Sequence, residues 1–311
     1  MSIFVIDDLL SDENKSLLEG SIPNEIFHYY PTKIFNYPPH PDFLSSDICF
    51  GNIPPQWIPA NNNLKWIQLI SVGFGEYLGL DWMQLSGRLI ITNLSGFFAR
   101  AVSQSILAGI LSLYRKIDEL VILKKSRIWK GDPLRESMKT LDNKIVILFG
   151  NGSINRSLSE ILSLFNCKIK VFDSKGKLNN LDKAIPKADI IVSVVPDTPG
   201  TNNIFNKTRL KSMKKGAVFV NFGRGSVVDE EALADSLYDD QIGGAVIDVT
   251  NQEPLSNNHR FWNCPNLILT QHTGGGTIDE IERKNKHFIE NYSLFKEGKK
   301  LNGLVDFKKG Y

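Results

Sequence analysis

The second half of the chain alternates short apolar segments with helical stretches, and this alternation restricts its possible folds more than any other feature. Most of these segments are rich in β-branched residues and almost continuously apolar, as is typical of parallel strands covered on both faces. They are Lys144–Phe149, Lys168–Phe172, Asp189–Val194, Gly216–Asn221, Ala245–Val249 and Leu267–Thr270. Strands with crossover helices between them predict an α/β fold with a doubly wound parallel sheet of the Rossmann type.

The first part of the chain has the pattern of a smaller α/β layer. Residues 1–92 alternate short apolar runs with loops rich in Pro and Asn. The candidate strands are Ile3–Ile6, Glu25–His28, Asp47–Phe50, Lys65–Ile70 and Leu89–Thr92. An amphipathic helix is predicted at Phe98–Ile117, as a core or interdomain helix that also suits pairing with a second subunit. A final helix is expected at about 278–297.

Composition and charge argue against several classes of protein. With 36 Lys and Arg against 34 Asp and Glu, the net charge of +2 argues against a nucleic-acid binder with a broad basic face. No stretch reaches the roughly 18 apolar residues of a membrane helix, so no membrane partner is expected. Cys49, Cys167 and Cys264 lie far apart, which favours reduced thiols in a cytoplasmic protein. The histidines show no paired spacing, so no metal is expected.

The first strand of the predicted sheet leads into a glycine-rich turn, Gly150-Asn151-Gly152-Ser153-Ile154-Asn155. The first glycine permits a tight turn, and the second lets a pyrophosphate approach the backbone at the N-terminus of the next helix. The third position of this fingerprint is normally Gly or Ala. Its occupant here, Asn155, is expected to push strand and helix apart, at a cost of about 1–3 kcal/mol.

An acidic residue, Asp173, follows the second strand, roughly 20 residues after the first glycine, as dinucleotide-binding folds require. Its carboxylate can accept hydrogen bonds from the adenosine ribose and would repel a 2′-phosphate, which favours NAD over NADP. The nearby Lys175 and Lys177 work against that preference. We therefore predict a dinucleotide-binding domain at 95–277, which includes the helix at 98–117. It is inserted into a smaller substrate domain made of 1–94 and 278–311.

Several longer segments of the chain have a distinctive sequence. They are Val194–Thr201, Met213–Glu230, Gly244–Val249, Glu253-Pro254, Asn266–His272 and the terminal Gly310-Tyr311. On these segments the chain resembles the D-isomer-specific 2-hydroxyacid dehydrogenases, which include glyoxylate, hydroxypyruvate and phosphoglycerate dehydrogenases. The resemblance runs from about residue 62 to 311, and the first 60 residues match only in general layout. It implies a flavodoxin-like substrate domain and a homodimer.

The resemblance implies a catalytic trio of Arg224, Glu253 and His272. Hydride addition to a keto carbon leaves negative charge on oxygen, and a histidine can protonate that oxygen. A carboxylate on the other ring nitrogen fixes the tautomer, and an arginine fork suits the substrate carboxylate and carbonyl. Without this context, His272 is more often structural. The alternatives for the other two are a surface ion pair for Arg224 and a simple turn for Glu253-Pro254.

The resemblance also implies contacts with cofactor and substrate. The dinucleotide contacts fall on Gly150, Gly152, Ser153 and Ile154 (pyrophosphate), Asp173 (ribose), Val195 and Pro196 (adenine side), Phe222, Gly223 and Asp248 (nicotinamide), and Gly274 beside His272. In the first domain, Ser71-Val72-Gly73-Phe74-Gly75 resembles the family's Ala-Gly-Val-Asp loop. Its N–H groups at Val72, Gly73 and Phe74 are expected to hold the substrate carboxylate. The alternative for this loop is an ordinary glycine-rich turn.

These observations support two hypotheses about function. The first is an NAD-dependent oxidoreductase that interconverts a small 2-keto acid and its D-2-hydroxy acid, such as glyoxylate or the pair hydroxypyruvate and D-glycerate. The second is an NAD(H)-responsive binding or regulatory protein that keeps the dehydrogenase fold. Four positions depart from the family pattern, namely Gly75, Gln104, Asn155 and Gln271, where Asp, Glu, Gly and Pro are usual.

Overall fold

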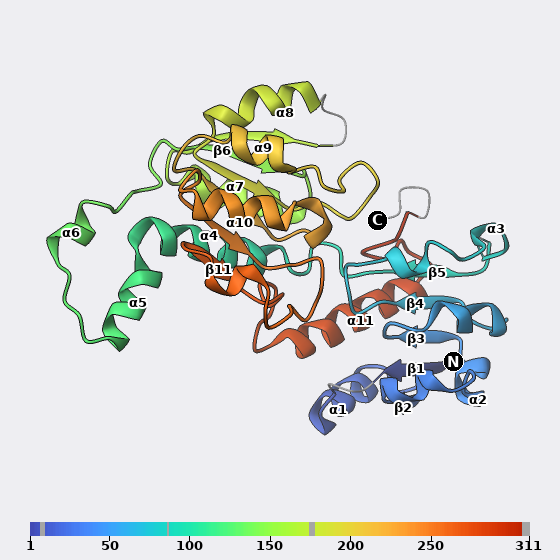
Figure 1. The fold of residues 1–311 in the computed structure, drawn as a ribbon. Helices are drawn as coiled ribbons and strands as arrows, with labels where there is room; N and C mark the ends of the chain where they lie inside the picture. The colour runs from blue at the N-terminus through green and yellow to red at the C-terminus, as the bar shows by residue number, and fades with distance from the viewer. Residues whose placement is uncertain (7–9, 86, 174–177, 307–311) are drawn as a thin grey trace. The chain divides into compact units, whose positions relative to one another are not determined.

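In a computed structural model, the chain forms two units, each with its own parallel sheet (Figure 1). The structure describes residues 1–6, 10–85, 87–173 and 178–306, so Lys175, Lys177 and the terminal Gly310-Tyr311 lie outside the described residues. Unit 1 consists of Met1–Phe97 and Thr277–Tyr311, and unit 2 of Phe98–Gly276. The units thus divide at 97/98 and 276/277, whereas the predicted boundaries were 94/95 and 277/278. The assignment of a substrate domain and a dinucleotide domain to these units stays a prediction.

Unit 2 contains a six-stranded parallel sheet in the order β11-β10-β9-β8-β6-β7. Its strands are β6 (Ile145–Phe149), β7 (Lys168–Phe172), β8 (Ile190–Ser193), β9 (Val218–Asn221), β10 (Gly244–Ile247) and β11 (Leu267–Leu269). This confirms the predicted doubly wound sheet. The strand order reverses direction between β6 and β8, and ligands of such sheets bind at the carboxyl ends of the strands beside that point.

Helices cover both faces of this sheet because alternate residues of each strand point to opposite sides. Val146 and Leu148 of β6 pack among residues of α4 (Ala99–Arg115) and α7 (Ser153–Ser163). Ile147 and Phe149 pack on the other side, among residues of α8 (Leu178–Ala184), α9 (Lys207–Ser212) and α10 (Glu230–Tyr238). The strands are therefore buried on both faces, which explains their continuous apolar character.

The helix predicted at 98–117 ends earlier than expected. Its last residue is Arg115, and Lys116 adopts a left-handed conformation with φ 56°. A second helix, α5 (Ile117–Lys125), begins directly after it, and α6 (Asp132–Arg135) follows. The left-handed residue turns the chain, so the apolar periodicity continues into a helix with a different direction.

Unit 1 contains a five-stranded parallel sheet in the flavodoxin-like order β2-β1-β3-β4-β5. Its strands are β1 (Ser2–Ile6), β2 (Ile26–Tyr30), β3 (Ile48–Phe50), β4 (Trp66–Gln68) and β5 (Ile90–Thr92), and its helices are α1 (Asp12–Ser21), α2 (Pro41–Ser45), α3 (Trp82–Leu85) and α11 (Glu280–Lys296). Phe288 of α11 stacks on Phe50 and Trp66, with ring centroids 4.4 and 5.2 Å apart. The C-terminal helix α11 thus packs into the core formed by the N-terminal strands of unit 1.

Short 3₁₀ turns complete the described secondary structure. They are Thr32–Asn36, Pro55–Ala60, Gly75–Tyr77, Ile185–Lys187, Gly225–Val227 and Arg260–Asn263. Arg283 of α11 binds Phe97, the last residue before the chain leaves unit 1, and Thr277, the first after it returns. Its guanidinium donates to the Phe97 carbonyl (3.0 Å) and to Thr277 Oγ1 (3.2 Å). In the described part of the chain, none of the helices has the length and apolar character needed to span a membrane.

Gly109 sets how closely α4 approaches the sheet of unit 2. A Cβ atom at this position would lie 2.6 Å from Val246 Cγ1 on β10, closer than carbon atoms can pack. We expect Gly109→Ala to lower the free energy of unfolding by about 1 kcal/mol or more, because overpacking outweighs the better helix propensity of alanine. Urea denaturation measures this change. The matched control is Gly20→Ala in α1, where a Cβ meets no atom within 4 Å. Equal stability of the two variants would contradict the close packing.

Candidate active site

The glycine turn after β6 lies against the loop after β8. Gly150 has φ 107°, and a Cβ atom there would lie 2.3 Å from the Val194 carbonyl oxygen. Only glycine satisfies both conditions. Gly152 caps α7, and its own Cβ would meet no described atom within 4 Å. The predicted pyrophosphate residues therefore lie at an open helix N-terminus, where Ser153 and Ile154 present N–H groups without intrahelical partners.

Asn155 makes hydrogen bonds that its residue type alone does not predict. It is only 2% exposed, and its side-chain amide donates to two backbone carbonyls, those of Phe149 (3.1 Å) and Gly150 (2.9 Å). The side chain therefore joins α7 to the end of β6 through hydrogen bonds. The steric penalty stays a prediction, and the two hydrogen bonds offset part of any such cost.

The end of β7 is also tied to this turn. The Gly150 N–H donates to the Phe172 carbonyl at 2.7 Å, and Asp173 follows at once as a half-buried residue. The predicted ribose ligand thus comes directly after the strand beside the glycine turn. This is the position at which a dinucleotide fold needs its acidic residue.

The loops after β8 and β9 meet through their backbones. A Cβ atom on Gly223 would lie 2.6 Å from the Val195 carbonyl oxygen and 2.8 Å from its nitrogen. Sequence inspection missed Asn221, a fully buried residue at the end of β9. Its amide accepts from the Gly223 N–H (3.1 Å) and donates to the Arg224 carbonyl (2.9 Å). Asn221 therefore shapes the loop that carries Arg224, and its polar side chain inside an apolar strand was the signal for this role.

Asp248 is the anchor of the loop that carries His272. Its carbonyl accepts from the His272 N–H (2.6 Å), and its buried carboxylate accepts from Thr270 Oγ1 (2.5 Å) and the Gly274 N–H (3.1 Å). Both carboxylate bonds use the same oxygen, Oδ1. A Cβ atom on Gly274 would lie 2.5 Å from the Phe222 ring. The structure thus brings together three predicted residues, Phe222, Asp248 and Gly274.

His272 and Glu253 form a hydrogen-bonded pair, with 2.7 Å between Nδ1 and Oε2. The other carboxylate oxygen accepts from the Thr250 N–H at 3.0 Å. Partial burial by itself raises the pKa of Glu253. Hydrogen bonds from His272 and Thr250, with the charges of His272 and Arg224, outweigh it and hold this pKa below its ordinary value. The carboxylate is therefore ionised at neutral pH, so Nδ1 of His272 must carry the proton in this pair. Nε2 is then left for proton exchange.

The backbone at His272 adopts an uncommon conformation. Gln271 and His272 both lie in the left-handed region, with φ 53° and 56°. Such residues cost of order 1–3 kcal/mol each and persist where surrounding contacts hold them, here those to Asp248. A proline ring fixes φ near −65° and has no place in this conformation. The departure from proline at position 271 therefore matches the backbone of this loop.

In unit 1, the predicted carboxylate loop presents unused amides. Ser71 Oγ donates to the Gly73 carbonyl (3.0 Å), and Asn93 Nδ2 donates to the Val72 carbonyl (2.9 Å). The Phe74 ring is buried and stacks on Tyr77. Within the described residues, the N–H groups of Val72 and Gly73 have no acceptor. Side chains thus hold the carbonyls of this loop, which leaves its amides for an anion.

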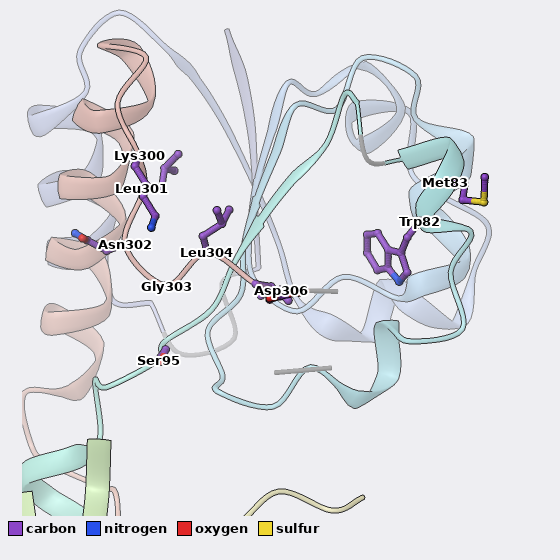
Figure 2. Close-up of a pocket in the computed structure, with 10 residues that line it drawn as sticks. Trp82, Met83, Ser95, Lys300, Leu301, Asn302, Gly303, Leu304 and Asp306 are labelled. Carbon is purple, nitrogen blue, oxygen red and sulfur yellow. The ribbon is translucent and has the colours of Figure 1, made fainter. Parts of the chain in front are cut away.

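A separate hollow of about 1100 Å³ lies in unit 1 and includes none of the predicted site residues (Figure 2). Its lining comes from α3, from Ser95, and from residues 300–306 after α11. Its most exposed apolar side chain, Met83, points to solvent. Among the described residues, no group of three or more His, Cys, Asp or Glu side chains is placed to hold a metal ion.

Comparisons with known proteins identify the family that this chain resembles in sequence and fold. Residues 107–274 match the family described as D-isomer specific 2-hydroxyacid dehydrogenase, NAD binding domain. A glyoxylate reductase of Thermofilum pendens is 31% identical over 268 residues, which cover 82% of this chain and 78% of that protein. A D-isomer specific 2-hydroxyacid dehydrogenase family protein from Aeromonas salmonicida covers 98% of this chain and 99% of its own, with a TM-score of 0.81 and 25% identity. A further solved structure, from Xanthobacter autotrophicus in complex with NADPH, shares the fold at 20% identity and a TM-score of 0.81.

The backbone of the Arg224 loop depends on Gly225. A Cβ atom there would lie 2.1 Å from the Thr250 carbonyl carbon and 2.3 Å from the Asn251 nitrogen. Because backbone atoms cannot rotate away, we expect Gly225→Ala to destabilise the protein by about 1–3 kcal/mol or more. Gly152→Ala, with open space around its Cβ, is the control and should unfold like the wild type. Thermal unfolding of both variants tests this, and an unchanged melting temperature for Gly225→Ala would overturn it.

Proposed function

Because this chain belongs to the D-isomer specific 2-hydroxyacid dehydrogenase family, we propose that it reduces a small 2-keto acid to the D-2-hydroxy acid with a nicotinamide dinucleotide. The observation that carries the proposal is the 2.7 Å pair of His272 and Glu253, on the loops that follow β10 and β11. The glycine turn lies at the same carboxyl edge of the same parallel sheet. A proton donor and a dinucleotide site at one edge are what hydride transfer to a carbonyl requires.

The residues at this edge fit a dinucleotide. The open side of Gly152 and the N–H groups of Ser153 and Ile154 suit a pyrophosphate, and Asp173 suits a ribose. Val195 and Pro196 would flank the adenine side. Phe222, Gly223, Asp248 and Gly274 would lie near the nicotinamide. When bound, the reduced nicotinamide supplies the hydride.

The protein's own residues hold the substrate and move the proton. Arg224, an exposed guanidinium, binds the substrate carboxylate and carbonyl oxygen through paired hydrogen bonds. His272 Nε2 donates a proton to the carbonyl oxygen as negative charge develops there. Glu253 holds the ring by its Nδ1–H and stabilises the positive imidazolium. In unit 1, the backbone amides of Val72, Gly73 and Phe74 suit a substrate carboxylate.

The favoured substrates are glyoxylate and hydroxypyruvate, with D-glycerate as a product. Relatives named glyoxylate reductase and glycerate dehydrogenase support this class. Asp173 supports NAD over NADP, although solved neighbours of this fold were crystallised with NADPH or NADP. Three free cysteines, Cys49, Cys167 and Cys264, support a reducing cytoplasmic location.

The proposal is tested by mixing the purified protein with a panel of 2-keto acids and either NADH or NADPH, and following the absorbance of the reduced cofactor. We expect turnover of glyoxylate or hydroxypyruvate, with higher kcat/KM for NADH because of the Asp173 carboxylate. Binding of NADH without turnover of any acid would favour the regulatory alternative. A preference for NADPH would overturn the role given to Asp173.

His272→Ala separates chemistry from folding. We expect it to lower kcat by about 10²–10⁴-fold, the usual contribution of a general acid, while the Kd for NADH changes little. Glu253→Gln keeps the shape of the pair but removes its charge, and should lower kcat less. Circular dichroism checks that both variants fold. If His272→Ala instead unfolds the protein, and Glu253→Gln retains full activity, the pair is structural.

We further propose that the protein is a homodimer and that α5 carries part of the interface. The apolar side of α4 is buried within its own unit, whereas no residue of α5 is buried. Leu120, Val121 and Ile122 of α5 are exposed, as are Ile128 and Trp129, the latter by 96%. Figure 1 shows α5 and α6 extending from α4 away from the sheet of unit 2. Such an apolar surface suits a second copy of the chain.

Light scattering after size-exclusion chromatography tests the dimer. We expect the wild type to elute at twice the chain mass of 35.0 kDa, and Ile122→Asp with Trp129→Ser to elute as a monomer. A matched control is Leu164→Asp, which changes another exposed apolar residue of the same unit. A monomeric wild type would contradict the proposed homodimer. A dimeric double variant would show that the interface does not depend on α5 and Trp129.

A further inference from the structure

Asn155 occupies the one place in the glycine fingerprint where the chain departs from the usual small residue. The side chain is buried, and its two N–H groups donate to consecutive carbonyls, Phe149 (3.1 Å) and Gly150 (2.9 Å). These are the last carbonyl of β6 and the first of the turn. An amide nitrogen has two hydrogens to donate, so its donor capacity is fully used on this turn. A residue kept only for its volume would not show this match.

The effect of these bonds follows from the planarity of the peptide group. In a trans peptide, the C=O and the next N–H point in opposite directions. Asn155 holds the Gly150 carbonyl towards itself, so the Asn151 N–H points to the other side of the turn. The preceding peptide is held as well, because the Gly150 N–H donates to the Phe172 carbonyl at 2.7 Å. Hydrogen bonds therefore hold each of the two peptide groups that flank Gly150 in a single orientation.

The hydrogen bonds from Asn155 matter because, without them, the peptide that follows Gly150 could change its orientation. At φ 107° it occupies a region that glycine enters freely, and a glycine also permits the following peptide to flip. A flip would turn the Gly150 carbonyl oxygen towards the open side beside Gly152, where the proposed function places a pyrophosphate. A carbonyl dipole facing an anion opposes binding, whereas an N–H favours it.

We propose that Asn155 is a positioning residue for the dinucleotide, which holds the phosphate-binding turn in its binding orientation before the ligand arrives. The inference rests on the proposed placement of the dinucleotide at Gly152. Asn155 Oδ1 has no hydrogen-bond partner in the described part of the chain, so the hydrogen bonds of this side chain there are the two to the turn. Preorganisation of this kind strengthens binding by removing the cost of ordering the loop.

Three variants separate this role from simple packing. Asn155→Leu keeps the volume and removes both donors. Asn155→Asp keeps the shape and replaces the donor nitrogen by an acceptor facing two carbonyls. Asn155→Gly restores the usual residue of the fingerprint, and so keeps a folded variant in the set if the other two fail to fold.

Isothermal titration with NADH gives the Kd of each variant, and steady-state kinetics gives kcat and the KM for the keto acid. We expect the Kd for NADH to rise about tenfold for all three variants, equivalent to about 1.4 kcal/mol. At saturating NADH, kcat should stay within about twofold of the wild type, and the KM for the keto acid should not change. Hydrogen exchange at residues 150–154 should be faster in the free variants and return to the wild-type rate when NADH is bound. A loss of thermal stability alone would not produce this pattern.

The outcomes distinguish the inference from the function on which it rests. If the wild type binds neither NADH nor NADPH, the proposed function fails. If the wild type binds NADH and folded Asn155→Gly or Asn155→Leu binds it equally well, Asn155 has no positioning role. An equal fall in kcat and in affinity would also overturn the inference, because it would place Asn155 in the chemistry instead.

Discussion

Backbone-to-backbone contact between the loops at the carboxyl edge of the unit 2 sheet is the constraint on which the rest of the site depends. Gly150, Gly223 and Gly225 each approach a backbone atom of another loop so closely that a Cβ would lie between 2.1 and 2.6 Å from it. Side chains can rotate out of a clash, but backbone atoms held in hydrogen-bonded loops cannot. The loops after β6, β8, β9 and β10 therefore form one connected layer. Arg224 is held in place by its neighbours in this layer.

Buried polar side chains hold the loops of this layer in place through hydrogen bonds to their backbone. Asn221 ends β9, Asp248 follows β10 directly, and Asn155 lies in the first turn of α7; each binds backbone groups of the loops at this edge. An unpaired polar group costs free energy when buried, so each of these side chains is stable only while its loop keeps one conformation. This explains how His272 can hold a left-handed backbone and still present its ring to Glu253. The cost of that conformation is offset by the bonds to Asp248.

Much of the fold was predictable because it follows from local patterns. The strands of both sheets appear in the sequence as apolar runs. Helices between successive strands predict that the strands run parallel to one another. The break at Lys116 was not predictable, because the apolar periodicity continues through it and nothing in the residue type signals a left-handed turn. The hydrogen bonds of Asn155 were not predictable for a related reason. Its volume is visible in the sequence, whereas the two carbonyls that accept its hydrogen bonds become neighbours only after β6 and α7 pack together.

The parallel α/β architecture, the glycine turn and the residue types for the proposed hydride transfer could be predicted from the residues alone, since these depend on periodicity, backbone freedom and side-chain chemistry. Which of those groups meet depends on how the loops pack. The 2.7 Å contact of His272 with Glu253 and the burial of Asp248 depend on loops that are separate in sequence. Hydrogen bonds require positions within a few tenths of an ångström, and such positions arise from packing across the whole sheet.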